Sequence, residues 1–185
     1  MVYGNSDTAT GVLRDEHQLI LGVVDVLRGQ LANTDLRPDL DVVDRCIAFF
    51  RLYADLCHHG KEEDLLFPEL IEHGMPEDAG PIAVMLSEHE QGRVYVRGMK
   101  EAMTGTRSGE EDAESLLRAN ATNFIDLIQA HIGKEDGILF EMADNLVTGD
   151  SCRALCGRYD ATHENRFEGQ TKHDLEQIAG ALIGQ

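Results

Sequence analysis

The chain has few basic residues, no long apolar run and no basic start at its N-terminus. Its 16 Lys and Arg are outnumbered by 34 Asp and Glu, which gives a net charge of −18. A protein this acidic is not expected to bind nucleic acid or an anionic membrane. No stretch approaches the roughly 18 uncharged apolar residues of a membrane span, and the first residues lack the apolar core of a signal peptide. We therefore expect a cytoplasmic protein with neither a nucleic-acid nor a membrane partner.

Cysteine is also scarce, with four residues in a chain of 185. Four cysteines do not make a disulfide framework in a protein of this length. Cys46 and Cys57 fall in an apolar helical segment and are expected to be buried thiols. Cys152 and Cys156 are four residues apart and could bind a metal or oxidise, but no second Cys/His pair accompanies them. The sequence also lacks a strand pattern and a Gly-rich phosphate loop, so an all-α protein is predicted.

Apolar residues recur at helical spacing along nearly the whole chain. We expect helices over residues 8–32, 39–67, 81–104, 110–147 and 150–182. Pro68 should break or kink the chain after the second helix, residues 105–109 should form a polar linker, and Gly169 should interrupt the last helix. The length predicts one main domain, which we assign to residues 1–149, with residues 150–185 as a helical extension packed on it.

An internal repeat built on His-x-x-x-Glu organises the sequence. Residues 58–67 (HHGKEEDLLF) recur as residues 131–140 (HIGKEDGILF), at an offset of 73. Upstream of each copy lies a Glu-His pair that ends at His17 or at His89, at an offset of 72. The pattern is therefore one His followed by His-x-x-x-Glu, repeated once, and such repeats set the architecture of a protein.

The spacing of the repeat predicts a metal site. Residues i and i+4 of an α-helix lie on the same face, one turn apart, so the His and Glu of each motif project together. The two upstream histidines can each add one ligand from a separate helix, and helical bundles build their metal sites in this way from facing helices. The candidate metal ligands are His17, His58, Glu62, His89, His131 and Glu135.

This donor set favours two metal ions over one. Six protein donors would saturate a single octahedral ion, whereas two ions bridged by Glu62 and Glu135 keep open positions for a small molecule. Ferritin-like sites use Glu-x-x-His and four carboxylates, while here His precedes Glu and imidazoles outnumber carboxylates. Two carboxylates on two divalent ions leave a formal charge of about +2. Such a centre should accept an anionic bridge such as oxide, hydroxide or peroxide.

Alternatives exist within the motif. A single His-x-x-x-Glu on a helix is usually a solvent-facing pair, and the repetition is what argues for metal. His59 with Glu63 competes with His58 and Glu62 for the ligand role. The second copy has Ile132 at the position of His59, which favours His58 with Glu62. The repeated lysines, Lys61 and Lys134, are most simply interpreted as solvated.

The repeat resembles the hemerythrin-like (HHE cation-binding) family, in its His/His-x-x-x-Glu/His/His-x-x-x-Glu branch, over roughly residues 10–147. The resemblance implies a four-helix up-down bundle, here with an additional C-terminal helical segment. It also implies a centre of two non-haem iron ions with an oxo or hydroxo bridge. The family's ligands fall on His17, His58, Glu62, His89, His131 and Glu135.

One departure from the family bears on function. Oxygen-carrying hemerythrins place a further His one turn after the third-helix His and an Asp in the fourth motif. This chain has Arg93 and Glu135 at those places, and an Arg offers only donors and cannot ligate iron. The departure argues against simple reversible oxygen carriage. It makes the chain more similar to the family's iron-sensing, peroxide-handling and iron-sulfur repair members.

The expected function is to bind, sense or reduce a small oxidant such as oxygen, peroxide or nitric oxide. An enzyme of this kind would be catalase-like, disproportionating peroxide, or another oxidoreductase. Tyr159 and His163 are candidates for an extra ligand or a proton relay, although their helical face could simply pack on the bundle. Apolar neighbours of the ligands should make a dry pocket: Leu13, Leu21, Met85, Leu127 and Leu139.

The alternative is a protein without turnover of its own. It would be an iron store, an iron donor or an iron-dependent regulator, including one for iron-sulfur repair. The sequence shows no Cys-rich repair module and no obvious signalling domain. A redox or protein partner would then be a separate chain, and its identity is open.

Overall fold

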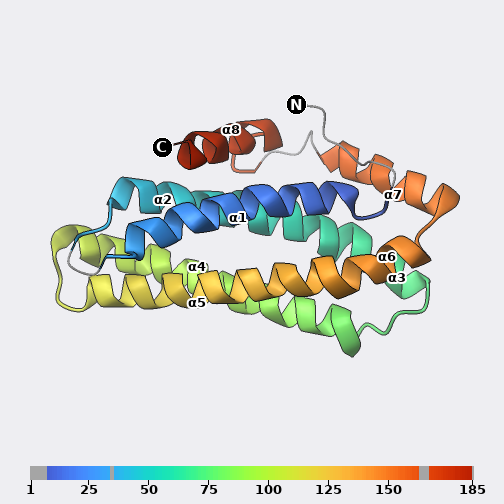
Figure 1. Ribbon diagram of the computed structural model, residues 1–185, viewed down its shortest axis with the longest axis horizontal. Coiled ribbons are helices and arrows are strands. Elements are labelled where there is room, and N and C mark those ends of the chain that lie inside the picture. The colour runs from blue at the N-terminus through green and yellow to red at the C-terminus, as the bar shows by residue number, and fades with distance from the viewer. Residues whose placement is uncertain (1–7, 34–35, 163–166, 185) are drawn as a thin grey trace.

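The computed structural model describes residues 8–33, 36–162 and 167–184, and long helical rods lie side by side in it (Figure 1). The first rod is α1 (Gly11–Leu31), and the third is α4 (Gly80–Ser108). The second rod runs through α2 (Leu40–Phe49), η1 (Phe50–His59), η2 (Glu62–Leu66) and α3 (Phe67–Glu72). The fourth runs through α5 (Ala113–Lys134), η3 (Glu135–Leu139) and α6 (Phe140–Leu146). Two shorter helices follow, α7 (Gly149–Ala161) and α8 (Lys172–Ile183).

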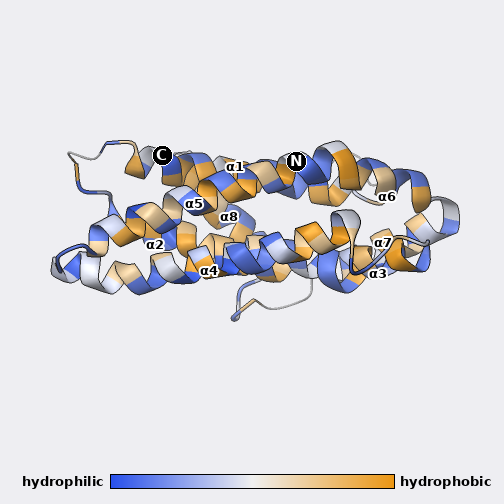
Figure 2. Cartoon of the chain, turned by 90° about the horizontal axis from the view of Figure 1, so that it is seen from below, coloured by the Kyte–Doolittle hydropathy of each residue, from blue (hydrophilic) through white to orange (hydrophobic). Residues whose placement is uncertain are grey.

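The rods pack around a core that falls into two apolar clusters. Helix α4 packs along α5, and α1 contacts both α2 and α5. Figure 2 shows hydrophobic and hydrophilic residues alternating along these rods, as expected for helices with one buried face. One cluster includes Phe50 and Phe124, and the other includes Phe67 and Phe140. On every rod the predicted metal ligands lie between the two clusters, so a polar layer separates two apolar ones.

Three segments of the second and fourth rods are π-helical, and the repeated motif coincides with them. Segment η1 ends at His59, η2 begins at Glu62, and η3 begins at Glu135. A π-helix bonds each N–H to the carbonyl five residues back, and such turns occur often at functional sites. The wider turn rotates successive side chains by a smaller angle than an α-helix does. Two consecutive residues can therefore both face the interior.

Two predicted helix ends are wrong. The second rod does not break at Pro68, because α3 continues to Glu72 with this proline in its first turn, and a kink there stays a prediction. The π-helical pattern ends there, with Phe67 N–H donating to the carbonyl of Glu62. A proline is tolerated in the first turn because its missing N–H is not needed there. Likewise α4 continues through most of the expected linker, to Ser108, and Gly109 ends it with φ 80°.

The C-terminal helices contact the bundle. Helix α7 contacts η2, and α8 contacts α1, α2 and η1. As expected, a turn at Gly169 (φ 91°) separates the two helices, and a reciprocal Thr171–Asp174 cap starts α8. The division of the chain at residues 149 and 150 remains a prediction. Among the described residues, no helix is long and apolar enough to cross a membrane.

Candidate metal centre

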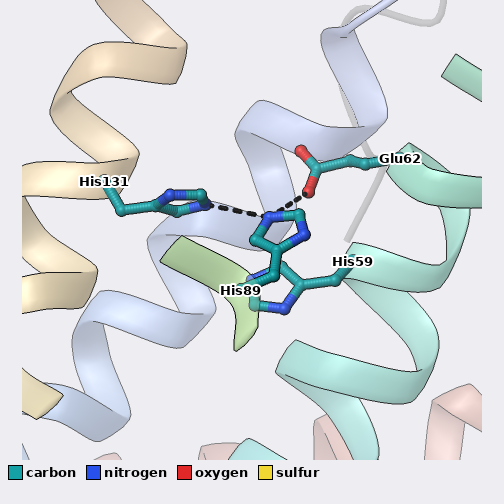
Figure 3. Close-up of side chains that lie close together, drawn as sticks. All are labelled: His59, Glu62, His89 and His131. Atoms are coloured by element: carbon teal, nitrogen blue, oxygen red, sulfur yellow. Dashed lines mark hydrogen bonds and ion pairs between the residues drawn. The ribbon is translucent and has the colours of Figure 1, made fainter. Parts of the chain in front are cut away.

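The structure brings the six predicted ligands together in the polar layer, and it adds His59. Figure 3 shows four of these side chains, from three rods, pointing toward one another. The six predicted residues are at most 2% exposed, and His59 is 6% exposed. The residues of the cluster are His17, His58, His59, Glu62, His89, His131 and Glu135.

The ligand atoms form two groups that share Glu62. In each group, one donor atom per residue lies within 4.8 Å of the others. We call the first the two-histidine group; it consists of His17, His58, Glu62 and Glu135. We call the second the three-histidine group; it consists of His59, His89, His131 and Glu62. Each group alone has the donor types and the proximity to hold one metal ion.

Both carboxylates lie between the two groups. Glu62 places one oxygen 3.6 Å from His58 Nε2 and the other 3.5 Å from His89 Nε2. Glu135 lies 3.1 Å from His17 Nε2 and 3.3 Å from His131 Nε2. Each carboxylate thus lies beside two imidazoles, one from the two-histidine group and one from the three-histidine group. This is the placement expected of carboxylates that bridge two ions.

The glutamates that precede His17 and His89 hold the histidines of the repeated motif. Glu16 accepts from His58 Nδ1 at 2.9 Å, and Glu88 accepts from His131 Nδ1 at 3.0 Å. The repeated lysines hold these glutamates in turn: Lys61 donates to Glu16 at 2.7 Å, and Lys134 donates to Glu88. A carboxylate on the far ring nitrogen fixes the tautomer and orientation of a metal-binding His. The expectation that Lys61 is solvated is wrong, because it is only 1% exposed.

The other two histidines, His17 and His89, are held by the acidic residues that directly follow Glu135 and Glu62. Asp136 accepts from His17 Nδ1 at 2.9 Å, and Glu63 accepts from His89 Nδ1 at 2.7 Å. All four histidines of the repeat therefore have an acid at Nδ1 and present Nε2 to the centre. Sequence reasoning missed these four acids, although each occupies a repeated position next to a predicted ligand. That recurrence was the available signal.

Burial and charge set the protonation of the metal-free cluster. Burial raises the pKa of Glu62 well above its usual value, and the neighbouring charge of Glu135 raises it further. Burial alone would also raise the pKa of Glu16, but Lys61, His58 and Lys172 hold it far below its usual value. Burial lowers the pKa of His58 to about 4. An ion entering the cluster therefore meets a neutral His58, and its positive charge opposes the rise in the pKa of Glu62.

Several buried atoms of the cluster have no hydrogen-bond partner. They are His17 Nε2, both nitrogens of His59 and all four oxygens of Glu62 and Glu135. Among the described residues, the one other buried side-chain atom of this kind is the Tyr159 hydroxyl. Leaving such atoms unpaired costs about 1–3 kcal/mol each, so a folded protein rarely concentrates them in one place. Their convergence fits bound metal, which would satisfy His17 Nε2, the carboxylate oxygens and one nitrogen of His59.

His59 and His58 do not compete, contrary to the expectation from sequence. His58 faces the two-histidine group and His59 faces the three-histidine group, so the π-helical turn brings both inside. The ring of His59 stacks on His89 with centroids 3.8 Å apart. Burial lowers the pKa of His59 well below its usual value, which keeps its imidazole neutral and able to bind a metal. The second copy has an isoleucine here, so the repeat gave no signal for His59.

Other predicted residues lie outside the ligand groups. Tyr159 is fully buried in the apolar cluster of Phe67 and Phe140, and burial raises the pKa of its hydroxyl well above the usual value. His163 lies outside the described residues. Arg93 is neither a ligand nor free in solvent, because its guanidinium lies 2.8 Å from both Asp55 and Glu63. Through Glu63 it holds His89.

The surroundings of the cluster are apolar on both sides. Of the expected pocket residues, Leu13, Met85 and Leu139 are buried in the cluster of Phe67 and Phe140. On the other side a cavity of about 260 Å³ lies between η1, α4 and α5. It reaches His59, His89 and His131, and Leu127 lines it. The three-histidine group therefore adjoins an open space.

Comparison with known proteins agrees with this geometry. Residues 8–143 match the family model of the hemerythrin HHE cation-binding domain. The matched range begins before α1, ends within α6 and contains the whole ligand cluster. No curated protein matches the chain.

Proposed function

Because the chain belongs to the hemerythrin HHE cation-binding family, we propose that it holds two non-haem iron ions and binds, senses or reduces a small oxidant. The oxidant would be oxygen, peroxide or nitric oxide. The observation that carries the proposal is the pair of buried ligand groups that share Glu62. Imidazole and carboxylate donors suit iron, although they also suit other divalent metals. We take the scaffold to be a four-helix up-down bundle and the location to be the cytoplasm, where four free cysteines persist.

The residues divide between the two ions. His17 and His58 would hold one ion, and His59, His89 and His131 would hold the other, with Glu62 and Glu135 shared. When bound, the irons would supply the change of oxidation state that a small oxidant needs. The three-histidine group faces the cavity and would meet an incoming molecule first.

The chain's own groups set up this chemistry. The acids at Nδ1 hold each ring with Nε2 inward, and Lys61 holds Glu16 in place. Apolar side chains such as Leu13 and Leu139 exclude water from one side of the cluster. In a dry site the charges of Glu62 and Glu135 act more strongly on the ions than they would in water.

A regulatory role without turnover is the second candidate, and one contact favours it. Lys172 of α8 lies 2.9 Å from Glu16, which holds His58. The C-terminal helix is therefore linked to the two-histidine group through one carboxylate. Loss of metal would loosen His58, Glu16 and the docking of α8 together, as an iron-dependent regulator requires.

Metal analysis with an optical spectrum tests the proposal. We expect about two irons per chain and the near-ultraviolet absorption of a bridged diferric pair. One zinc per chain and no iron, after expression with added iron, would contradict the di-iron proposal. Turnover of peroxide by the iron form would support a catalase-like or other oxidoreductase activity, whereas stoichiometric binding alone would favour the regulator or store.

Oxygen carriage can be tested on the same sample. We expect poor reversibility, because Arg93 is bound to acids at the position where carriers have a further ligand. The protein is reduced without air, exposed to oxygen and purged, while its spectrum is followed. A stable oxygenated spectrum that returns fully to the reduced form over repeated cycles would restore oxygen carriage as the leading function.

A further inference from the structure

We propose that the cavity beside the three-histidine group binds a linear monocarboxylate, with its alkyl chain inside the cavity and its carboxylate at Arg97. The proposal rests on the proposed function, because the iron centre would form the inner end of this cavity. It goes further by assigning an organic ligand to the same site. Four features carry it: the size of the cavity, its walls, the charges at its mouth and its length.

The cavity is larger than a small oxidant requires. Its volume is about 260 Å³, whereas one water molecule takes about 30 Å³ in the liquid. Oxygen, nitric oxide and peroxide are each similar in size to one or two waters. The cavity could therefore hold one of them and still have most of its volume free. A passage for such molecules alone would not need this space.

The walls are apolar. They include Ile47 and Phe50 from the second rod, Val96 from α4, and Phe124 and Ile128 from α5. Apolar cavities of this kind tend to stay free of water and to bind apolar molecules. The polar side chains that line the cavity are the histidines at its inner end and charged residues such as Arg93 and Arg97, so the apolar stretch between them offers no hydrogen-bond partners to a sugar or a nucleotide. The body of the ligand should therefore be a hydrocarbon.

The charges at the mouth select a carboxylate. Arg51 is paired with Glu168, Arg93 with Asp55, Glu63 and Glu90, and Lys100 with Asp44. Arg97 also lines the cavity and is exposed, and among the described residues no acid lies within ion-pair distance of it. A guanidinium of this kind can take a carboxylate in two parallel hydrogen bonds. One unpaired cation at the mouth fits a ligand with one negative charge.

The length of the cavity limits the alkyl chain. Arg97 lies eight residues after His89 on α4, which is about 12 Å along a helix axis at 1.5 Å per residue. Because an extended alkyl chain is a zigzag, each carbon–carbon bond of about 1.5 Å advances it by about 1.25 Å. A chain of eight carbons therefore covers about 9 Å of this distance and leaves about 3 Å for the contacts at its two ends. Octanoate is therefore the probe of choice, with its methyl end beside His59 and His89.

Gly92 lies between the two ends and keeps the cavity open. A Cβ at this position would meet Leu127 at 3.8 Å and Phe124 at 3.9 Å, which are ordinary contacts. Close helix packing therefore does not require glycine here. A larger side chain would instead project into the cavity. Gly92→Leu should fill it, and Gly29→Leu on α1, where a Cβ would meet nothing within 4 Å, is the matched control.

Titration calorimetry of the iron-loaded protein with octanoate and with 1-octanol tests the proposal. Octanoate should bind more tightly than octanol, and Gly92→Leu should weaken both ligands at least tenfold while Gly29→Leu leaves them unchanged. Arg97→Met should weaken octanoate about fivefold, as expected for an exposed ion pair, and leave octanol unchanged. Because Arg97 is exposed, its variant tests the proposal even if Gly92→Leu does not fold.

Three outcomes would overturn the proposal: no octanoate binding, equal binding of octanoate and octanol, or octanoate binding that Gly92→Leu leaves unchanged. Iron content, measured on each sample, reports separately on the proposed function. Two irons with no octanoate binding would overturn only the cavity ligand. Octanoate binding that responds to both variants in a protein without iron would uphold the cavity ligand and overturn the di-iron centre.

Discussion

The two ligand groups come from one repeated motif, yet their surroundings differ. In the two-histidine group, His58 is held by Glu16, whose side chain is 2% exposed and is bonded to both Lys61 and Lys172. In the three-histidine group, His131 is held by Glu88, whose side chain is 19% exposed and is bonded to Lys134. The added cation, Lys172, comes from α8, and within residues 8–33, 36–162 and 167–184 no second lysine is paired with Glu88.

The comparison shows that two copies of one motif can differ in function because different parts of the protein pack against them. The C-terminal helix encloses the two-histidine group, where buried charges must be paired to be tolerated. The three-histidine group adjoins the cavity instead. We infer that the enclosed group anchors the centre and that the open group meets ligands. The following experiments test this division, from the largest expected effect to the smallest.

Removing a shared carboxylate should affect both groups. Glu62→Ala should cost most of the bound metal, because Glu62 belongs to both ligand groups. Glu63→Ala is the matched control, since Glu63 only holds His89 from outside. It should weaken metal binding about 10- to 100-fold, which leaves the protein loaded when iron is in excess. Metal content by elemental analysis measures both, and equal loss in the two variants would contradict the assignment.

Metal removal should lower the melting temperature. Without metal, the ring nitrogens of His59 and the carboxylate oxygens of Glu62 stay unpaired inside an apolar bundle. Metal at a hundred times its dissociation constant stabilises the folded state by about 2.7 kcal/mol, or about 5–10 °C for a protein of this size. Calorimetry before and after chelation measures the change. An unchanged melting temperature after verified removal would count against a metal inside the bundle.

The corresponding histidines of the two groups should also titrate differently. Burial alone would lower the pKa of His17, but Asp136 and Glu135 raise it to about 9, whereas burial lowers the pKa of His89. In the metal-free protein, the stability that protonated His17 contributes is complete below its ordinary pKa of 6.5 and is lost as pH rises through about 9. The pKa of His89 is lowered instead, so this residue contributes no stability of that kind.

Bound metal excludes the proton from His17, so the loaded protein lacks this dependence. The gap in melting temperature between the loaded and the metal-free protein should therefore widen as pH rises from 6.5 to 9. His131, whose pKa is also raised, acts in the same direction. Calorimetry of both forms across this range measures the gap. A constant gap would show that His17 carries no extra proton in the metal-free state.

Two lysine variants separate the enclosed group from the open one. Lys172→Met removes a buried partner of Glu16 and should cost about 1–3 kcal/mol, because Lys61 and His58 still hold this glutamate. Lys134→Met removes a half-exposed partner of Glu88 and should cost about 0–1 kcal/mol. Urea unfolding of the two variants measures both. Equal costs would mean that α8 does not distinguish the groups.

The repeat by itself determined which six residues meet. A His four residues before a Glu lies on the same face of any helix, and two copies with two further histidines leave few other arrangements. The helical spacing of apolar residues indicated an all-α protein. The repeat resembled the hemerythrin-like family, and the family match confirms that membership. The acids that hold the histidines at Nδ1 could also have been predicted from the sequence, because they recur next to the ligands in both copies of the repeat.

Only the tertiary structure decided the positions of His59 and Lys61 and the presence of the cavity. His59 faces the centre because π-helical turns replace α-helical ones around the first motif, and sequence periodicity assumes a constant turn. Lys61 is buried because Glu16 lies on another rod, and Lys172 reaches the same glutamate from α8. The cavity likewise lies between rods that are far apart in sequence. Spacing along one helix fixes which side chains share a face, whereas packing between helices fixes what that face meets.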